Sequence, residues 1–321
     1  MMKIILVVLV VMMSIPASAI LVDAENDAES LAMGASLGFM GTGAAWMEEG
    51  GLRYGAGSCN LICNNPQDGA WIMTAAHAIR WPQTGETFHY IRYTFDPYFD
   101  AYPRGTTVYD PIKSIAAANG KVFYHPTQDI ALVKLEHLVY DSTGELITPI
   151  EFYHGQLQDN QVILFGGSGQ TGIPSQASES GTGYDDGYDR CVRGVFYFFS
   201  AAVPSRAVMK FTRSVPLPGI AAPGDSGGFT AIEENGKVLM VGIIVRGTGS
   251  GESLLTGFEY LGYNSGFFDW MNTIIQSNGD NSTPTPTNTA TATATQTATI
   301  TASPTPSSTE QESAVTEWGL Y

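Results

Sequence analysis

The chain has few charged side chains for its 321 residues, and basic ones are especially scarce. Only 14% of the residues are charged, with 15 Lys and Arg against 31 Asp and Glu, so the formal net charge is −16. Nucleic acids and anionic membrane surfaces are bound through clusters of basic side chains. The composition therefore argues against both partners, and its acidity is typical of a protein that stays in solution.

Cysteine is equally scarce, with only Cys59, Cys63 and Cys191. Cys59 and Cys63 are about 13 Å apart in an extended strand, which is too far for a disulfide unless a turn lies between them. A zinc site would need a fourth ligand and clustered histidines. We therefore predict no metal site and no cofactor, and we expect at least one of the three thiols to be buried.

Long hydrophobic runs are rare, and the one at the N-terminus is short. Lys3 precedes an apolar run over residues 4–13, and the small-residue sequence Ala-Ser-Ala ends at Ala19. This arrangement is typical of a secretory signal over residues 1–19, and the run is too short to span a bilayer. We therefore expect a secreted, extracellular or cell-surface protein without a membrane span after signal removal. The alternative is an uncleaved anchor.

Two further segments lack the pattern of a folded domain. Residues 20–34 are mostly polar and acidic without clear periodicity, and we interpret them as either a propeptide or a loose N-terminus. Residues 279–321 contain a long stretch rich in Thr, Pro, Ala and Ser that can bury almost nothing. Such composition is typical of a linker, so we predict a disordered stalk and tail there.

The remaining residues, 35–278, form the predicted domain. The chain holds 36 Gly and 17 Pro, and short apolar runs alternate with turn residues, which favours strands over long helices. The expected strands are residues 37–46, 57–63, 70–75, 87–95, 107–112, 122–124, 130–135, 147–153, 161–166, 192–199, 208–212, 228–233, 238–246 and 256–261. Strands at such spacing are typical of barrels or sandwiches, and the predicted fold class is all-β.

One helix is predicted near the end of the domain, over residues 265–276. Its apolar residues recur at a spacing of three to four and predict a buried face. They are Phe267, Trp270, Met271 and Ile274. Ser265 is the candidate N-cap.

The stretch Gly-Asp-Ser-Gly-Gly, residues 224–228, carries the first chemical signal. Its glycines suit a tight, exposed turn in which the backbone approaches a substrate closely. Ser226 would present its hydroxyl there, and the N–H groups of Gly224 and Ser226 can converge on one point. When a serine attacks a carbonyl group, the carbonyl oxygen becomes an oxyanion that such donors stabilise. Gly224 and Ser226 are therefore the candidate oxyanion hole.

Two upstream motifs supply the partners that a serine nucleophile needs. Thr-Ala-Ala-His ends at His77, and Asp-Ile-Ala-Leu begins at Asp129. A serine hydroxyl is a poor nucleophile at neutral pH, so an imidazole must take its proton, and a carboxylate must orient the imidazole and stabilise its cation. His77 is thus the candidate base, Asp129 the orienting acid and Ser226 the nucleophile. The remaining histidines have no partner motif and are expected in surface or structural roles.

With these motifs in the order His, Asp, Ser, the chain resembles the trypsin/chymotrypsin family of serine endopeptidases, in its bacterial-type secreted form. The resemblance implies two six-stranded antiparallel β-barrels, about residues 35–140 and 145–264, followed by a C-terminal helix. His77 and Asp129 would lie on the first barrel and Ser226 on the second. It also implies an active endopeptidase whose partners are protein or peptide substrates, and we expect a monomer.

The resemblance further implies where specificity resides. In the family, the residue six before the nucleophile, here Ile220, lies at the base of the pocket for the side chain that precedes the scissile bond. An enzyme that cleaves after Arg or Lys has Asp there, so Ile220 implies an apolar pocket. The strand edge facing the substrate backbone would be Val245, Arg246 and Gly247, where the family usually carries Ser-Trp-Gly. Arg246 is an alternative determinant that would favour an acidic residue.

Two further departures concern the structure around the site. The family often bridges the residue after the catalytic His to the facing strand, and these positions are here Ala78 and Gly57, so that bridge is absent. Animal members are activated when cleavage frees an Ile-Val-Gly-Gly terminus whose amine pairs with the Asp before the nucleophile, here Asp225. That tetrapeptide is absent, and signal cleavage would expose Ile20 followed by Leu and Val. The sequence leaves open what satisfies Asp225.

Three alternatives carry less weight. The first is a protease-like domain that serves as a displayed binding module on the Thr-rich stalk, and the complete set of three motifs favours the enzyme. An esterase of the α/β-hydrolase type requires the order Ser, Asp, His, which this chain does not have. The third is a calcium site at Asp185, Asp186 and Asp189, where we favour a solvated loop.

Overall fold

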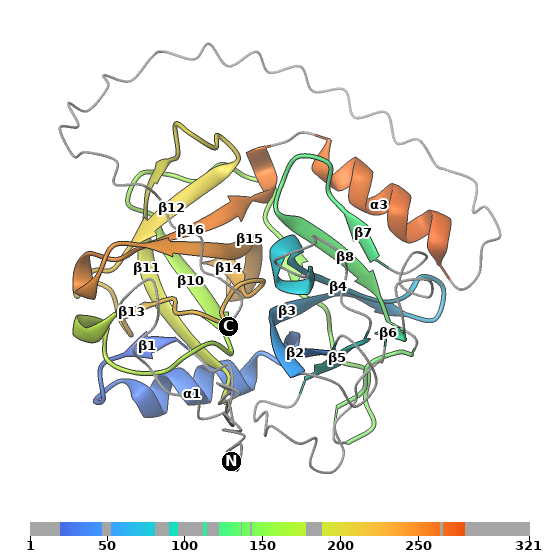
Figure 1. Ribbon diagram of the computed structural model, residues 1–321, viewed down its shortest axis with the longest axis horizontal. Coiled ribbons are helices and arrows are strands. Elements are labelled where there is room, and N and C mark those ends of the chain that lie inside the picture. Colours follow the sequence, from blue (N-terminus) through green and yellow to red (C-terminus); the bar gives the residue numbers. More distant parts are fainter. Residues whose placement is uncertain are drawn as a thin grey trace, which may run out of the picture.

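The computed structural model describes residues 20–46, 53–80, 90–95, 112–113, 122–135, 137–141, 143–177, 188–263 and 266–279. The predicted signal and nearly all of the predicted stalk and tail lie outside this set, as do Asp185, Asp186 and Ser265. Within it, two seven-stranded β-sheets contact each other, with the two described α-helices at their outer sides (Figure 1). No helix of the described residues is long and apolar enough to cross a membrane.

The second half of the chain forms a closed barrel. Its strands are β10 (Val162–Gly167), β11 (Arg190–Phe199), β12 (Arg206–Lys210), β14 (Phe229–Glu234), β15 (Lys237–Thr248) and β16 (Leu255–Tyr260). They pair antiparallel in the order β14-β10-β11-β12-β16-β15, and β14 also pairs with β15, which closes the ring. The short strand β9 (Glu151–Phe152) adds to β15 in parallel. Alternating apolar side chains such as Phe165, Met209 and Phe258 fill this barrel's own core.

The first half of the chain forms a second sheet, named the open sheet because no pairing closes it among the described residues. Its strands are β2 (Met40–Trp46), β3 (Arg53–Asn65), β4 (Gly69–Ala75), β5 (Tyr90–Thr94), β6 (Ile112–Lys113), β7 (Val122–Tyr124) and β8 (Ile130–Lys134). Their order is β6-β5-β2-β3-β4-β8-β7, and no pairing joins β6 to β7 among the described residues. The structure therefore shows one of the two predicted closed barrels, and the described residues of the first half form a seven-stranded sheet.

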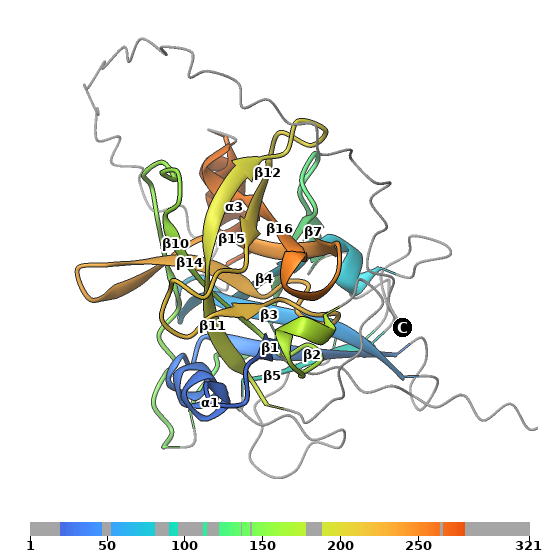
Figure 2. The ribbon, with the colours of Figure 1, turned by 90° about the vertical axis from the view of Figure 1, so that its left-hand side faces the viewer.

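The N-terminal segment, for which the sequence predicts either a propeptide or a loose N-terminus over residues 20–34, contains a short strand and a helix. Strand β1 (Leu21–Val22) pairs with β13 (Gly219–Ile220), and helix α1 (Asp27–Ser36) packs against β11 below the barrel (Figure 2). Asp27 forms an ion pair with the buried Arg190 at 2.8 Å. The helix faces the barrel with Ser30 and Gly34, which are too small to give an apolar stripe in the sequence.

Helix α3 (Phe267–Asn278) has a buried face, as the apolar spacing predicts, and it lies beside the open sheet. Phe267 and Met271 are buried in the core of that sheet, and Trp270 and Ile274 pack against it while remaining partly exposed. The helix begins one residue after Gly266, which is its N-cap in place of the predicted Ser265.

All three cysteines are free thiols, and the expectation that at least one of them is buried is confirmed. Cys59 and Cys191 are buried, and Cys63 is half-buried. A Cβ at Gly57 would lie 3.1 Å from the Cβ of Ala78, so these two positions do face each other without a bridge. Asp189 is also buried, which corrects the prediction of a solvated loop at that residue.

The contact between α1 and β11 yields the first testable prediction. A Cβ at Gly34 would clash with the backbone carbonyl of Asp189, so Gly34→Ala should lower the free energy of unfolding by about 1–3 kcal/mol, as overpacking does. Gly38→Ala is the matched control, because its Cβ meets only Ile147, at 3.8 Å. Urea unfolding of both variants measures the difference, and equal stabilities would show that α1 does not press on β11.

Candidate active site

The register of the open sheet brings His77 next to Asp129. Strand β4 is buried along its whole length and pairs with β8 so that Ala75 lies opposite Ile130. Asp129 immediately precedes Ile130, and His77 lies in the short 3₁₀ helix Ala76–Ile79 that follows β4. The N–H of His77 donates to Asp129 Oδ1 at 2.9 Å. One strand pairing therefore positions both residues.

Ser226 comes from the closed barrel, on a turn that touches the open sheet. Gly224 and Gly227 have φ of 96° and 89°, which only glycine adopts readily, so the turn needs both. The N–H of Ser58 on β3 donates to the Ser226 carbonyl at 2.8 Å, and Asn60 Nδ2 donates to the Gly227 carbonyl at 2.8 Å. A Cβ at Gly227 would clash with the Ser58 carbonyl. The turn is thus seated directly on β3.

These elements bring the three predicted side chains together. Ser226 Oγ lies 2.9 Å from His77 Nε2, and His77 Nδ1 lies 2.6 Å from Asp129 Oδ2. Burial raises the pKa of Asp129, but the charge of His77 and its two hydrogen bonds outweigh this effect and lower it. An ionised Asp129 keeps a proton on His77 Nδ1, which leaves Nε2 free to accept a proton from Ser226.

Asp225 points away from this arrangement into the barrel, where it is fully buried. Its carboxylate accepts hydrogen bonds from the N–H groups of Gly169 at 2.7 Å and Ala222 at 2.6 Å, and also from the N–H of Ile20. Burial raises the pKa of Asp225 to about 7, although these bonds and the charge of Arg190 oppose the effect. The sequence leaves open which groups satisfy Asp225, and the N–H of Ile20 is one of them. The side chain of Ile20 is also fully buried.

The predicted specificity residues lie at two places. Ile220 is 1% exposed, pairs with Leu21 and belongs to the barrel core. Val245, Arg246 and Gly247 follow each other on β15, whose pairing with β14 ends at Ile243. Beyond that residue, the β14 side of the strand has no strand partner among the described residues. Val245 and Gly247 are buried, and Arg246 is half-buried.

The structure also shows a role for His125, which the sequence placed only among structural or surface histidines. Its Nδ1 accepts the N–H of Gln128 at 3.1 Å and that of Thr127 at 3.4 Å, so the ring is neutral with its proton on Nε2. The ring packs against Phe267 and Trp270 of α3. His125 thereby holds the loop that leads into Asp129.

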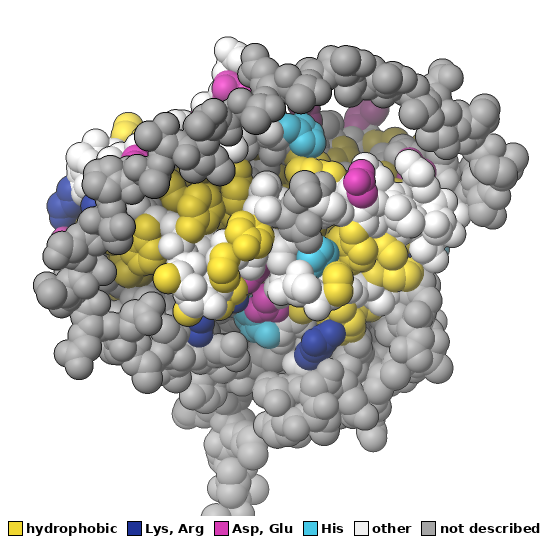
Figure 3. Space-filling model, turned by 90° about the horizontal axis from the view of Figure 1, so that it is seen from above, with side chains coloured by type: hydrophobic (Ala, Val, Ile, Leu, Met, Phe, Trp, Pro, Cys, Tyr) yellow, Lys and Arg dark blue, Asp and Glu magenta, His cyan; other side chains and the backbone are white. Residues whose placement is uncertain are grey.

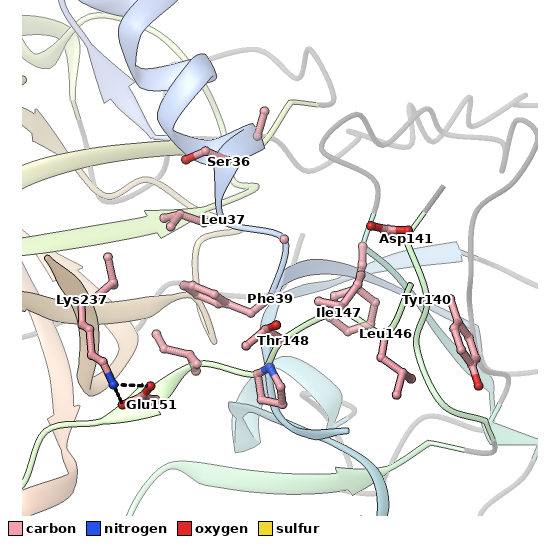
Figure 4. A pocket seen from close by; sticks show the side chains of 16 residues that line it. Ser36, Leu37, Phe39, Tyr140, Asp141, Leu146, Ile147, Thr148, Glu151 and Lys237 are labelled. Atoms are coloured by element: carbon pink, nitrogen blue, oxygen red, sulfur yellow. Dashed lines mark hydrogen bonds and ion pairs between the residues drawn. The ribbon is translucent and has the colours of Figure 1, made fainter. Parts of the chain in front are cut away.

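A groove of about 680 Å³ lies elsewhere, between the C-terminal end of α1 and the segment that links the two halves (Figure 4). It is lined by Leu37, Phe39 and Ile147 among others, and its Lys237 and Glu151 already pair with each other at 2.8 Å. None of the three predicted site residues lines it. The face seen in Figure 3 carries hydrophobic side chains on both halves, with charged side chains scattered among them.

The loop held by His125 yields the second prediction. His125→Leu leaves two backbone N–H groups without their acceptor and should lower the free energy of unfolding by about 1–3 kcal/mol. His125→Asn should lose less, because an Asn oxygen can accept an N–H two or three residues later.

Since burial lowers the pKa of His125, the wild type should lose stability as the pH falls below about 6.5, and neither variant should show this part of the loss. Urea unfolding between pH 5 and 8 measures both effects, and equal losses for Leu and Asn would contradict the role of Nδ1.

Comparison with known proteins bears on the fold. No protein-family model and no curated sequence matches the chain. Among solved structures, a mutant of human heparin binding protein (CAP37) is similar, with a TM-score of 0.53 and 14% sequence identity, over 77% of this chain and 95% of that one. This likeness shows the fold, and the chain has the trypsin-like fold that its three motifs imply.

Proposed function

We propose that this protein is a secreted serine endopeptidase that hydrolyses peptide bonds through Ser226, His77 and Asp129. The observation that carries the proposal is the pair of contacts on His77, 2.9 Å to Ser226 Oγ and 2.6 Å to Asp129 Oδ2, within a trypsin-like fold. Hydroxyl, imidazole and carboxylate in hydrogen-bonded series are what an activated serine nucleophile requires.

The reaction follows from this geometry. His77 Nε2 takes the proton of Ser226 Oγ as the oxygen attacks the scissile carbonyl carbon, and the carbonyl oxygen becomes an oxyanion. No acceptor from the described part of the chain reaches the N–H groups of Gly224 and Ser226, which makes them the proposed donors to this oxyanion. His77 then gives its proton to the leaving amine, and an acyl-enzyme on Ser226 remains. Water hydrolyses the acyl-enzyme in the same sequence of proton transfers.

The substrate backbone is proposed to pair with the free side of β15 at Val245, Arg246 and Gly247. Main-chain pairing of this kind tolerates unusual side chains, because N–H and C=O groups make the contacts. Ile220 is proposed to form the base of an apolar pocket, and it offers no partner for a guanidinium or ammonium group. The enzyme is therefore not expected to require Arg or Lys before the scissile bond.

The alternative is a weakly active or inactive protease-like module that binds a partner while displayed on the Thr-rich stalk. The name of its structural neighbour, heparin binding protein, favours a binding role. Heparin is polyanionic, however, and the net charge of −16 opposes such a ligand here. The assembled Ser226, His77 and Asp129 support catalysis instead.

Substitution of the three residues tests the proposal. Ser226→Ala and His77→Ala should lower kcat by about 10⁶-fold, and Asp129→Ala by about 10⁴-fold, because the three act as a unit. Ser214→Ala, at an exposed serine, is the control and should retain full activity. Peptide hydrolysis and labelling with an active-site phosphonate, followed by mapping of the modified residue, provide the measurements. Near wild-type hydrolysis by Ser226→Ala would refute the assignment.

We propose further that the mature chain begins at Ile20. The N–H of Ile20 donates to the buried Asp225 carboxylate, and Ile20 is fully buried. Cleavage after Ala19 would convert this amide into an ammonium group and so give Asp225 a buried counter-charge. Signal removal would then also complete the support of the Ser226 turn.

This maturation step makes a pH-dependent prediction. With the leader attached, the pKa of Asp225 is raised on folding to about 7, so the folded state binds the extra proton and loses stability as the pH rises from about 4 to about 7. The loss is roughly 4 kcal/mol. A chain that begins at Ile20 should lose much less over this range, because the ammonium favours the ionised carboxylate. Denaturant unfolding of both chains from pH 4 to 8 tests this, and parallel curves would contradict it.

A further inference from the structure

Two arginines meet on the outer face of the closed barrel, beside the strand proposed to bind substrate. Arg246 on β15 lies opposite Gly257 on β16 in the ladder. A Cβ at Gly257 would lie 2.9 Å from Arg246 Cγ and 3.2 Å from Arg206 Cδ. The two stems therefore converge over the one position of β16 that has no side chain. A larger residue there would drive them apart.

The convergence of two like charges calls for acceptors. Arg206 donates to Glu259 at 2.8 Å, and the fully buried Glu259 also accepts a hydrogen bond from Ser205 at 2.8 Å. The Nε of Arg206 is buried and has no acceptor among the described residues. Arg246 also has a partner of its own, but each guanidinium carries five N–H donors, so the pair can take a further carboxylate. The attraction between the arginine pair and a carboxylate acts only at short range, because the net charge of −16 repels anions at long range.

This pair lies close to the reacting groups. Ile244 exchanges backbone hydrogen bonds with the Ser226 turn, donating to the Gly228 carbonyl at 2.8 Å and accepting from Gly227 at 2.7 Å. Arg246 follows two residues later, roughly 7 Å along the strand. The positive charge of Arg206 also contributes to the lowered pKa of Asp129, so Arg206 lies close enough to influence the site electrostatically.

An extended peptide on the free edge of β15 would place its side chains in register with those of the strand. Residues on neighbouring strands that lie opposite each other point to the same face of the sheet. The part of the substrate that stays on Ser226 as the acyl group is the part before the scissile bond, and it runs along Val245 to Gly247. A substrate side chain opposite Arg246 would thus face the two guanidinium groups.

We infer that the enzyme selects substrates with an acidic side chain a few residues before the scissile bond, held by Arg246 and Arg206. The inference rests on the proposed endopeptidase function and adds its substrate class. Carboxylate and guanidinium match in charge and geometry, and the bidentate pair adds specificity that a lone lysine would not give. The pocket at Ile220 and this arginine pair would then read two different positions of the same peptide.

The test uses peptides that share one apolar residue before the scissile bond and one leaving group. The residues that precede it are varied one at a time among Glu, Gln and Lys. The wild type should cleave the best Glu peptide with a kcat/KM about 10-fold or more above that of its Gln counterpart, because a charge-assisted pair replaces a neutral one. The effect should lie mainly in KM, since the pair acts on bound substrate and transition state alike.

Variants of Arg246 separate recognition from folding. Arg246→Gln should abolish the preference for Glu over Gln, and Arg246→Glu should reverse it in favour of Lys. Lys237→Gln is the control, because its exposed pair with Glu151 lies outside the site. Lys237→Gln should keep the wild-type rate of phosphonate labelling, and Arg246→Gln should still be labelled at Ser226, which shows that the site has formed.

The outcomes are distinct. If the wild type and Arg246→Gln cleave Glu and Gln peptides equally well, the inference is overturned and the endopeptidase stands. If the wild type cleaves no peptide and Ser226 is not labelled, the proposed function fails and the inference with it. A preference for Glu that persists in Arg246→Gln would assign recognition to other groups and also overturn the inference.

Discussion

The seating of the Ser226 turn on strand β3 is the contact on which the rest of the site depends. His77 and Asp129 belong to one sheet and Ser226 to the other, so their geometry is only as firm as the contact between the two halves. The Ser58 N–H to the Ser226 carbonyl and the Asn60 amide to the Gly227 carbonyl make that contact through buried hydrogen bonds. Gly227 lets the turn approach so closely, because any Cβ would clash with the Ser58 carbonyl.

The same turn is held from behind by a buried carboxylate. Asp225 accepts N–H groups from three separate segments, at Gly169, Ala222 and Ile20, so its placement requires all three to be in position. A buried ionised carboxylate is costly unless it is paired, and three hydrogen bonds offset only part of that cost. Helix α1 and strand β1 therefore matter to the site even though they supply none of its three reacting side chains. Their packing fixes where Ile20 lies.

Much of this could be predicted from the sequence, for physical reasons that differ by element. Strands such as β8 and β14 carry alternating or continuous apolar runs. Ser226, His77 and Asp129 lie in motifs whose chemistry requires each residue type. Helix α1 could not be found in this way, because it faces the barrel with Ser30 and Gly34 in place of an apolar stripe. Strands β1 and β13 are two residues long and give no period. The hydrogen bond from Ile20 to Asp225 joins segments that are distant in sequence. The role of His125 depends on which ring nitrogen accepts a hydrogen bond. No local sequence pattern encodes either feature.

Small polar residues meet where the two halves contact each other. All three thiols are free, and the hydrogen bonds between the halves include that from the Ser168 N–H to Ser58 Oγ at 2.9 Å. Each such bond contributes about 1 kcal/mol net, but a buried donor or acceptor left unpaired costs about 1–3 kcal/mol. These hydrogen bonds therefore add little stability but make the docking selective, because any other docking of the halves would leave these groups unpaired. That selectivity, more than strength, is what a site shared between two sheets requires.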